Sequence, residues 1–383
     1  MAGIVEVFAL LVVIFRCYKP SLRIKLAATA WILGLGILLM AADALNGTNS
    51  FVHLSRDASF YPGNIAGSPL YLVMRETRDT IYGDPTRYTP IKLSESATGR
   101  YFSESLSPSG SQDSLEKGLA SLSTINPGKL PDKIVLIVFE SLSVLASDPD
   151  LKSWQEPFKR VENRYTIESG TLSWGGATFR GEVRELCWQS RDGIEFGPLP
   201  PALPAVLKSL HYESCSFHGF YKTMYDRDRY YPMMGFDRSI FLNEMGKNDG
   251  VPLAGTLFHG ATDPYVASLV HREILQPGKQ FVYWLTLSTH VPINISFAKQ
   301  IALPEEQAMA SHLPPAIWGY TVICRKTLDS IAEIAADKSL TNCDFIIVGD
   351  HPLPLSSAKL RPYVASEQVP YLILRWKKPA TGS

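Results

Sequence analysis

The sequence predicts an α/β fold in which a mostly parallel central sheet has helices on both faces and is preceded by one or two transmembrane helices. Three short apolar runs predict the sheet: KIVLIVF from residue 133, QFVYWLTL from residue 280 and NCDFIIVG from residue 342. Each is rich in β-branched or aromatic residues and ends abruptly at polar ones, which is typical of strands buried in a parallel sheet. Helical patterns, which alternating β and α units require, lie at residues 199–212, 263–275 and 325–338.

The longest apolar stretches of the sequence lie near the N-terminus. Residues 26–45 form an apolar run close to the roughly 20 residues that span a bilayer. The earlier run, residues 2–15, is shorter and contains Glu6, so 26–45 is the stronger prediction. A signal peptide is the alternative, but its basic residues precede the apolar run, whereas here they follow it. By the positive-inside rule the basic loop between the runs is cytoplasmic and the chain after residue 45 lies on the outer side.

Composition separates the remaining regions. The chain has 37 basic and 37 acidic residues, a balance that gives no indication of a nucleic-acid partner. We expect a membrane anchor over residues 1–45, a linker with irregular or helical structure over 46–130, and an extracytoplasmic catalytic domain over 131–383. Within the linker, residues 94–114 are rich in Ser and Gly and predict a loop. Two readings stay open for the outer cysteines, two disulfides or buried free thiols: Cys187, Cys215, Cys324 and Cys343.

Polar side chains follow each predicted strand. Glu140 ends the first run, His290 lies just after the second, and Asp350 and His351 end the third. Because ligands bind at the carboxyl ends of the strands in open α/β sheets, these residues are expected to converge. A buried carboxylate needs a positive partner, and a metal ion would supply one. The alternative for Glu140 alone is a helix cap or a salt bridge.

These motifs resemble the alkaline phosphatase superfamily, in the sulfatase-like branch that contains lipoteichoic acid synthases and phosphoglycerol transferases. The matching segments are IVLIVFES with Glu140, ATFRGE with Thr178, and VGDH with Asp350 and His351. The resemblance implies that these four residues bind one divalent cation, usually manganese, and that Thr178 is the nucleophile. The ligand set also suits Mg²⁺ or Zn²⁺.

A further block, SFHGFYKTMYDRDRYYPMMGFD at residues 216–237, resembles a segment of the synthases. The resemblance implies that His218, Tyr225 and Arg227 contact a phosphoglycerol head group. LSTHVP likewise matches a strand that ends in a histidine near the nucleophile, His290, and Asp263 has a counterpart with a structural role. Read without the resemblance, the block is a surface helix with a packed aromatic face.

The chain also departs from this branch. Synthases usually carry five membrane helices, where this sequence predicts two at most. The residues after the Asp-His pair are PLPL, stiffer than the small polar residues common there. The Cys or Ser motif that marks true sulfatases is absent at the nucleophile position, so formylglycine chemistry is not expected.

Thr178 follows a Gly-Gly pair and precedes a helical pattern, which favours either a simple helix cap or a hydroxyl activated by a metal ion. With the resemblance, we expect a membrane-anchored transferase that moves phosphoglycerol from phosphatidylglycerol to a glycan or glycolipid acceptor through a phosphothreonine. His290 or His218 would protonate the leaving oxygen, Arg227 would hold the phosphate and Tyr225 the glycerol. The expected location is the outer side of a bacterial inner (plasma) membrane, facing the periplasm or the exterior. The alternatives are a phosphoethanolamine transferase, a phosphodiesterase or phosphatase, and a non-catalytic binding protein.

Overall fold

The computed structural model describes residues 87–105, 125–173, 178–192, 202–246, 251–254, 259–355 and 357–378. The predicted membrane anchor, residues 1–45, lies outside these ranges. Within them, none of the helices combines the length and apolar character needed to cross a membrane.

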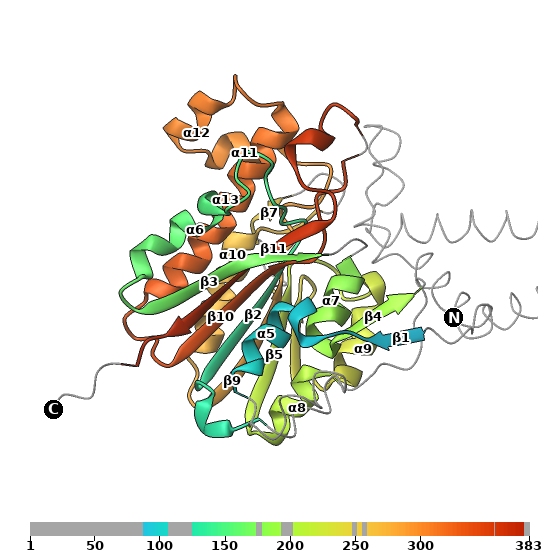
Figure 1. Ribbon diagram of the computed structural model, residues 1–383, viewed down its shortest axis with the longest axis vertical. Coiled ribbons are helices and arrows are strands. Elements are labelled where there is room, and N and C mark those ends of the chain that lie inside the picture. The colour runs from blue at the N-terminus through green and yellow to red at the C-terminus, as the bar shows by residue number, and fades with distance from the viewer. Residues whose placement is uncertain are drawn as a thin grey trace, which may run out of the picture. The chain divides into compact units, whose positions relative to one another are not determined.

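A seven-stranded sheet forms the centre of the fold (Figure 1). In spatial order its strands are β3 (Tyr165–Ser173), β11 (Gln368–Trp376), β10 (Cys343–Gly349), β2 (Lys133–Phe139), β9 (Lys279–Leu285), β5 (Tyr212–His218) and β6 (Arg238–Phe241). The strands from β10 to β6 pair in parallel, and β11 runs antiparallel to both β10 and β3. The predicted α/β fold with a mostly parallel sheet is therefore confirmed, and all three predicted runs are adjacent central strands.

Helices cover both faces of the sheet (Figure 1). On one face lie α6 (Lys152–Gln155), the 3-10 helix η6 (Glu156–Val161), α10 (Asp263–Ile274) and α13 (Pro315–Ala336). On the other lie α5 (Ala97–Ser103), α7 (Thr178–Cys187), α8 (Leu203–Ser209) and α9 (Arg227–Met234). Two short helices, α11 (Ile295–Ile301) and α12 (Pro304–Met309), extend one end of the first layer.

The smaller elements lie around this frame. They are the paired strands β1 (Arg87–Pro90) and β4 (Gln189–Asp192), the paired strands β7 (Leu253–Ala254) and β8 (Gly260–Ala261), and the 3-10 helices η1 (Leu93–Glu95), η5 (Pro127–Lys129), η7 (Met224–Asp226) and η8 (Arg361–Tyr363).

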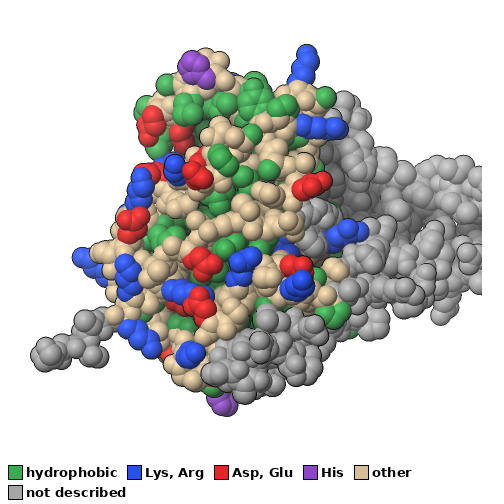
Figure 2. All heavy atoms as spheres, in the orientation of Figure 1, with side chains coloured by type: hydrophobic (Ala, Val, Ile, Leu, Met, Phe, Trp, Pro, Cys, Tyr) green, Lys and Arg blue, Asp and Glu red, His purple; other side chains and the backbone are tan. Residues whose placement is uncertain are grey.

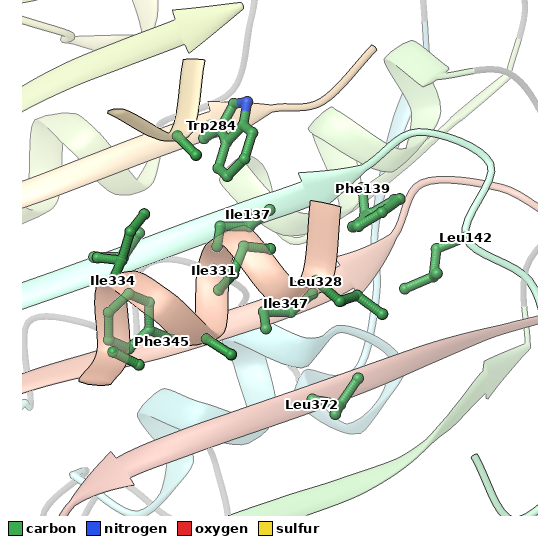
Figure 3. Packing of buried hydrophobic residues seen from close by; sticks show 14 of the residues in the cluster. Ile137, Phe139, Leu142, Trp284, Leu328, Ile331, Ile334, Phe345, Ile347 and Leu372 are labelled. Atoms are coloured by element: carbon green, nitrogen blue, oxygen red, sulfur yellow. The ribbon is translucent and has the colours of Figure 1, made fainter. Parts of the chain in front are cut away.

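The main core lies between the sheet and α13 (Figure 3). Every residue of β2 and β10 is buried, which explains their unbroken apolar sequences. Leu328, Ile331 and Ile334 recur at helical spacing on α13 and face Ile137 of β2 and Phe345 of β10. The helix predicted from residue 325 begins ten residues earlier, at Pro315, a residue type favoured at the first helical position.

The predicted loop at residues 94–114 contains α5 within its described part. Ser96 caps this helix by accepting a hydrogen bond from the Gly99 amide at 2.8 Å. Gly99 is required by close packing, because a Cβ there would lie 2.3 Å from the Leu93 carbonyl oxygen. Tyr101 is buried and its hydroxyl donates to Asp344 at 2.8 Å. Ser and Gly therefore serve a cap and a contact here, and residues 87–105 belong to the same compact unit as the sheet.

The four outer cysteines are all buried free thiols, so the disulfide reading is wrong for them: Cys187, Cys215, Cys324 and Cys343. On the face drawn in Figure 2, Lys and Arg side chains are interspersed with Asp and Glu, as the balanced composition suggests.

Candidate metal centre and nucleophile

Three predicted ligands meet at the carboxyl ends of β2 and β10. These strands pair in parallel with Gly349 opposite Phe139, so Glu140 and Asp350 leave the sheet at neighbouring positions. His351 Nε2 lies 3.5 Å from Glu140 Oε1 and 3.4 Å from Asp350 Oδ2. One ligand atom from each of the three residues lies within 4.8 Å of the others. The parallel register thus explains how residues 210 positions apart form one cluster.

Thr178 completes the cluster from the other side. It is the first residue of α7, and its Oγ1 lies 3.1 Å from Glu140 Oε2 and 3.3 Å from His351 Nε2. Gly181, one turn later, lets the helix approach the strand end, because a Cβ there would lie 2.7 Å from Asp350 Cα. The threonine hydroxyl therefore points at the carboxylates and the histidine.

Hydrogen bonds hold both carboxylates in place but leave one oxygen of Asp350 for another partner. Asp350 Oδ1 accepts hydrogen bonds from the amides of Ser141 at 2.7 Å and His351 at 2.6 Å. Glu140 Oε1 accepts one from the Ser141 hydroxyl at 2.8 Å. Asp350 Oδ2 is buried and accepts no hydrogen bond from any described residue. An orphaned buried carboxylate oxygen is costly unless it binds a cation.

The electrostatics of the cluster also fit a cation. Burial, followed by the negative charge of Glu140, raises the pKa of Asp350 to about 7. Burial acts to raise the pKa of Glu140 as well, but His290, His351 and two hydrogen bonds lower it overall. Burial acts to lower the pKa of His351, and the two carboxylates raise it overall. A divalent ion would favour both carboxylates ionised, and two oxygens, one imidazole nitrogen and one hydroxyl suit Mn²⁺, Mg²⁺ or Zn²⁺.

The cluster opens into a pocket of about 740 Å³. Thr178 and His351 line it together with two other predicted site residues, Tyr225 and His290. The remaining lining residues are Val291, Pro352, Leu353, Pro354, Leu355, Arg361, Val364 and Ser366. The structure thus places the predicted nucleophile, one ligand and two predicted substrate-side residues around one cavity.

His218 and Arg227 are buried behind this pocket and are not among its lining residues. His218 Nδ1 lies 3.0 Å from the Leu285 carbonyl oxygen. Burial, with Arg227 nearby, lowers the pKa of His218 well below 6.5. Of the two histidines that the sequence offers as proton donors, His290 lines the pocket and His218 does not.

Arg227, expected to bind phosphate, contacts a carboxylate that sequence reasoning did not single out as a site residue. Its Nη2 donates to Glu182 Oε2 at 2.8 Å, and both side chains are almost fully buried. Three tyrosine hydroxyls also donate to Glu182: Tyr230 at 2.9 Å, Tyr231 at 2.5 Å and Tyr283 at 3.1 Å. The sequence gives two hints: the matching segment ATFRGE has this acidic residue four positions after Thr178, and YDRDRYY is dense in Arg and Tyr.

The Glu182 cluster bears on the pocket through Tyr225. The Arg227 guanidinium lies over the Tyr225 ring, 5.2 Å from its centroid. Tyr225 has a φ of 54°, which side chains rarely adopt and which surrounding contacts must hold in place. Because Glu182 follows Thr178 by one turn of α7 and pairs with Arg227, its carboxylate links α7 to Tyr225.

A second buried ion pair links α7 to the end of β10, next to Asp350, and to α5. Arg184 pairs with Glu185 at 2.6 Å and donates through Nη2 to the Gly349 carbonyl at 2.6 Å. Glu185 accepts from the Thr98 amide at 2.9 Å and the Thr98 hydroxyl at 3.0 Å. The segment predicted as linker therefore takes part in fixing the nucleophile's helix.

We expect Glu182→Gln to lower the free energy of unfolding by about 3 kcal/mol, because Arg227 would keep a buried charge without a counter-ion. Thermal or urea unfolding measures this loss. Asp150→Asn is the control, since its ion pair with Lys152 is exposed and contributes little. An unchanged stability for Glu182→Gln would show that the cluster is not charge-dependent.

Asp263 has the structural position expected of it. It accepts hydrogen bonds from the amides of Leu287 at 2.9 Å and Ser288 at 3.0 Å, and so fixes the chain that leads to His290. Burial raises the pKa of Asp263 from 3.8 to about 6. Between these values the folded protein binds the proton more tightly than the unfolded chain does.

Raising the pH from 4 to 6 should therefore remove up to about 3 kcal/mol of stability through Asp263. Urea unfolding at pH 4.5 and 6.5 measures the change. In Asp263→Asn, which does not titrate, the loss between the two pH values should be smaller than in the unmodified protein. Equal losses of stability in Asp263→Asn and in the unmodified protein would assign the pH dependence to other titratable groups.

A family model described as Sulfatase matches residues 177–311, which include Thr178, the 216–237 block and His290. This match confirms the predicted resemblance to the sulfatase-like branch. Glu140, Asp350 and His351 lie outside the matched range, and comparison with curated proteins gives no match.

Solved structures show similarity at low identity. The lipoteichoic acid synthase LtaP from Listeria monocytogenes is 14% identical with a TM-score of 0.48, over 65% of this chain and 66% of that chain. The phosphoglycerol transferase GacH from Streptococcus pyogenes, in complex with sn-glycerol-1-phosphate, is 16% identical with a TM-score of 0.44, over 65% and 68%. The C-terminal periplasmic domain of EcEptC from Escherichia coli, in complex with Zn, is 13% identical with a TM-score of 0.46, over 66% and 75%. The match thus spans just under two thirds of the LtaP chain.

Proposed function

We propose that this protein, whose central segment matches the sulfatase family model, is a metal-dependent phosphotransferase that moves phosphoglycerol from phosphatidylglycerol to a glycan or glycolipid acceptor. The observation that carries the proposal is the position of the Thr178 hydroxyl, 3.1 Å from Glu140 Oε2 and 3.3 Å from His351 Nε2 at the floor of an open pocket. Glu140, Asp350, His351 and Thr178 would hold one divalent ion, with Mn²⁺ as the first candidate. The site would face the outer side of a bacterial inner membrane.

Two displacements follow from this arrangement. When bound, a divalent ion lowers the pKa of a hydroxyl and polarises a phosphoryl oxygen. Thr178 Oγ1, whose proton is released to solvent before the first turnover, attacks the phosphorus of the lipid, the bond to diacylglycerol breaks, and His290 gives a proton to the leaving oxygen. An acceptor hydroxyl then attacks the phosphothreonine, His290 takes its proton, and Thr178 is restored.

The protein supplies two further features for an anionic substrate. The phosphoryl group would lie at the N-terminus of α7, where the helix dipole favours negative charge. Tyr225 lines the same pocket and would pack against the glycerol of the head group. In this arrangement Arg227 acts through Tyr225, and its pairing with Glu182 replaces the phosphate contact expected from the sequence.

Peptide mass spectrometry tests the proposal. The full-length protein in detergent is incubated with Mn²⁺ and phosphatidylglycerol, digested, and searched for a glycerophosphate adduct on the peptide that contains Thr178. We expect that adduct, and its disappearance when an acceptor is added. An adduct formed only with phosphatidylethanolamine would instead assign a phosphoethanolamine transferase. Phosphate release without an adduct or an acceptor would assign a phosphodiesterase, and absence of any reaction despite bound metal a binding protein.

A further inference from the structure

The pocket above Thr178 has one apolar wall. Pro352, Leu353, Pro354 and Leu355 line it directly after the ligand His351, and Val364 joins them. Polar lining residues come from other elements, Thr178 from α7, Tyr225 from η7 and His290 from the segment after β9. Two more, Arg361 of η8 and Ser366, flank Val364 at the edge of this wall. The PLPL segment that distinguishes this sequence therefore forms one side of the reaction site.

This apolar wall, residues 352–355 with Val364, is a fixed extension of the core. Leu353 and Val364 belong to the core cluster that contains Leu142 and Val144, and Leu355 packs against it. The Leu353 amide donates to Ser143 Oγ at 2.7 Å, and the Ala365 amide donates to the Val144 carbonyl at 2.9 Å. Each proline also restricts its own backbone. The wall is thus preformed and does not need a ligand to assemble it.

Chemistry limits what such a wall can hold. Proline, leucine and valine side chains offer no hydrogen bond, so a polyhydroxylated acceptor gains little from them. Apolar surface gains about 25 cal/mol for each Å² removed from water, so an apolar group is the favoured occupant. Pro354 is exposed and Leu355 is partly exposed at the pocket, so part of the wall is open to a ligand.

The position of the wall indicates which apolar group of the substrate it contacts. The wall begins one residue after His351, whose Nε2 lies 3.3 Å from Thr178 Oγ1, so it adjoins the reacting phosphorus. A phosphodiester carries two substituents at that phosphorus. With the polar head group toward Tyr225, the other substituent is left for the apolar wall.

We propose that the apolar wall binds the diacylglycerol leaving group of the donor, through its glycerol ester region and first methylenes. The inference rests on the proposed function and assigns a lipid-recognition role to a segment unlike that of the resembling enzymes. Arg361, which lines the same pocket, holds the backbone of the wall, because its Nε donates to the Leu355 carbonyl at 3.2 Å. The wall would orient the scissile bond so that the diacylglycerol oxygen leaves on the side of the phosphorus opposite Thr178 Oγ1.

A donor series with increasing apolar content tests the wall. Glycerophosphoglycerol, dibutyryl phosphatidylglycerol and dihexanoyl phosphatidylglycerol share one phosphodiester, and the short chains keep them monomeric. We expect kcat/KM of the unmodified protein to rise along the series. Leu355→Gln should lower kcat/KM about tenfold for the dihexanoyl donor, mostly through KM, and much less for the shorter donors.

Controls distinguish an effect of the wall on donor binding from an effect on folding and from a failure of the proposed function. Leu275→Gln removes an equally large side chain that is 44% exposed and outside the pocket, and it should leave all three values unchanged. Equal losses for all donors in Leu355→Gln, or no loss for any, would overturn the role of the wall while leaving the transferase intact. If the unmodified protein transfers from no donor, the proposed function fails first and the wall assignment falls with it.

Discussion

Replacing Thr178 with alanine is expected to abolish transfer and leave the fold intact. The hydroxyl is the proposed nucleophile, and loss of a nucleophile lowers kcat by about 10⁴-fold or more. Thr178 is the first residue of α7 and is buried, so the variant loses one methyl group and the contacts of Oγ1 with Glu140 and His351, a cost of about 2 kcal/mol. Donor consumption and the adduct on the Thr178 peptide measure the first effect, and thermal unfolding measures the second.

Three further substitutions sharpen this test. Thr178→Val keeps the branched shape without the hydroxyl and should behave like alanine, whereas Thr178→Ser keeps the hydroxyl and should retain measurable transfer. Thr166→Ala, at an exposed threonine of β3, should have no effect. Transfer that persists in both Thr178→Ala and Thr178→Val would remove Thr178 from the mechanism.

The sheet could be predicted because its signal is local. Strands buried on both faces need apolar residues at every position, and polar residues appear where the strand leaves the core, as at Glu140 and Asp350. Parallel pairing then brings those ends together without further information. The same reasoning could not find α5, because Ser96 and Gly99 have the composition of a loop but act as a cap and a close contact.

The partner of Arg227 could not be predicted for a different reason. A guanidinium makes the same forked contacts with a phosphate and with a carboxylate, so the sequence block is compatible with both. Only the fold shows that Glu182 on α7 faces Arg227 on α9 inside a ring of tyrosine hydroxyls. The resemblance proposed His218, Tyr225 and Arg227 as substrate contacts, and the packing shows that Tyr225 alone of these three lines the pocket.

Chelating the metal ion should abolish transfer. Asp350→Asn, which replaces one of the proposed metal ligands, should also abolish it. Asn keeps an oxygen for the Ser141 and His351 amides but puts an NH₂ group where Oδ2 now lacks a hydrogen bond, so it offers the metal a donor instead of an anion. We expect at least a roughly 100-fold weaker metal affinity, since even partners of ligands change affinity by 10 to 100-fold.

Thermal unfolding with and without Mn²⁺ distinguishes ligand loss from misfolding. A bound ion stabilises the folded state, by about 2.7 kcal/mol at one hundred times its dissociation constant, so Tm of the unmodified protein should rise with Mn²⁺ and fall after chelation. Asp350→Asn should fold, because it removes one of two buried carboxylates that repel each other, but its Tm should not respond to Mn²⁺. Asp150→Asn, at an exposed carboxylate, should respond like the unmodified protein. A normal response of Asp350→Asn to Mn²⁺ would place the ion elsewhere, and transfer that survives complete chelation would exclude the metal from the reaction.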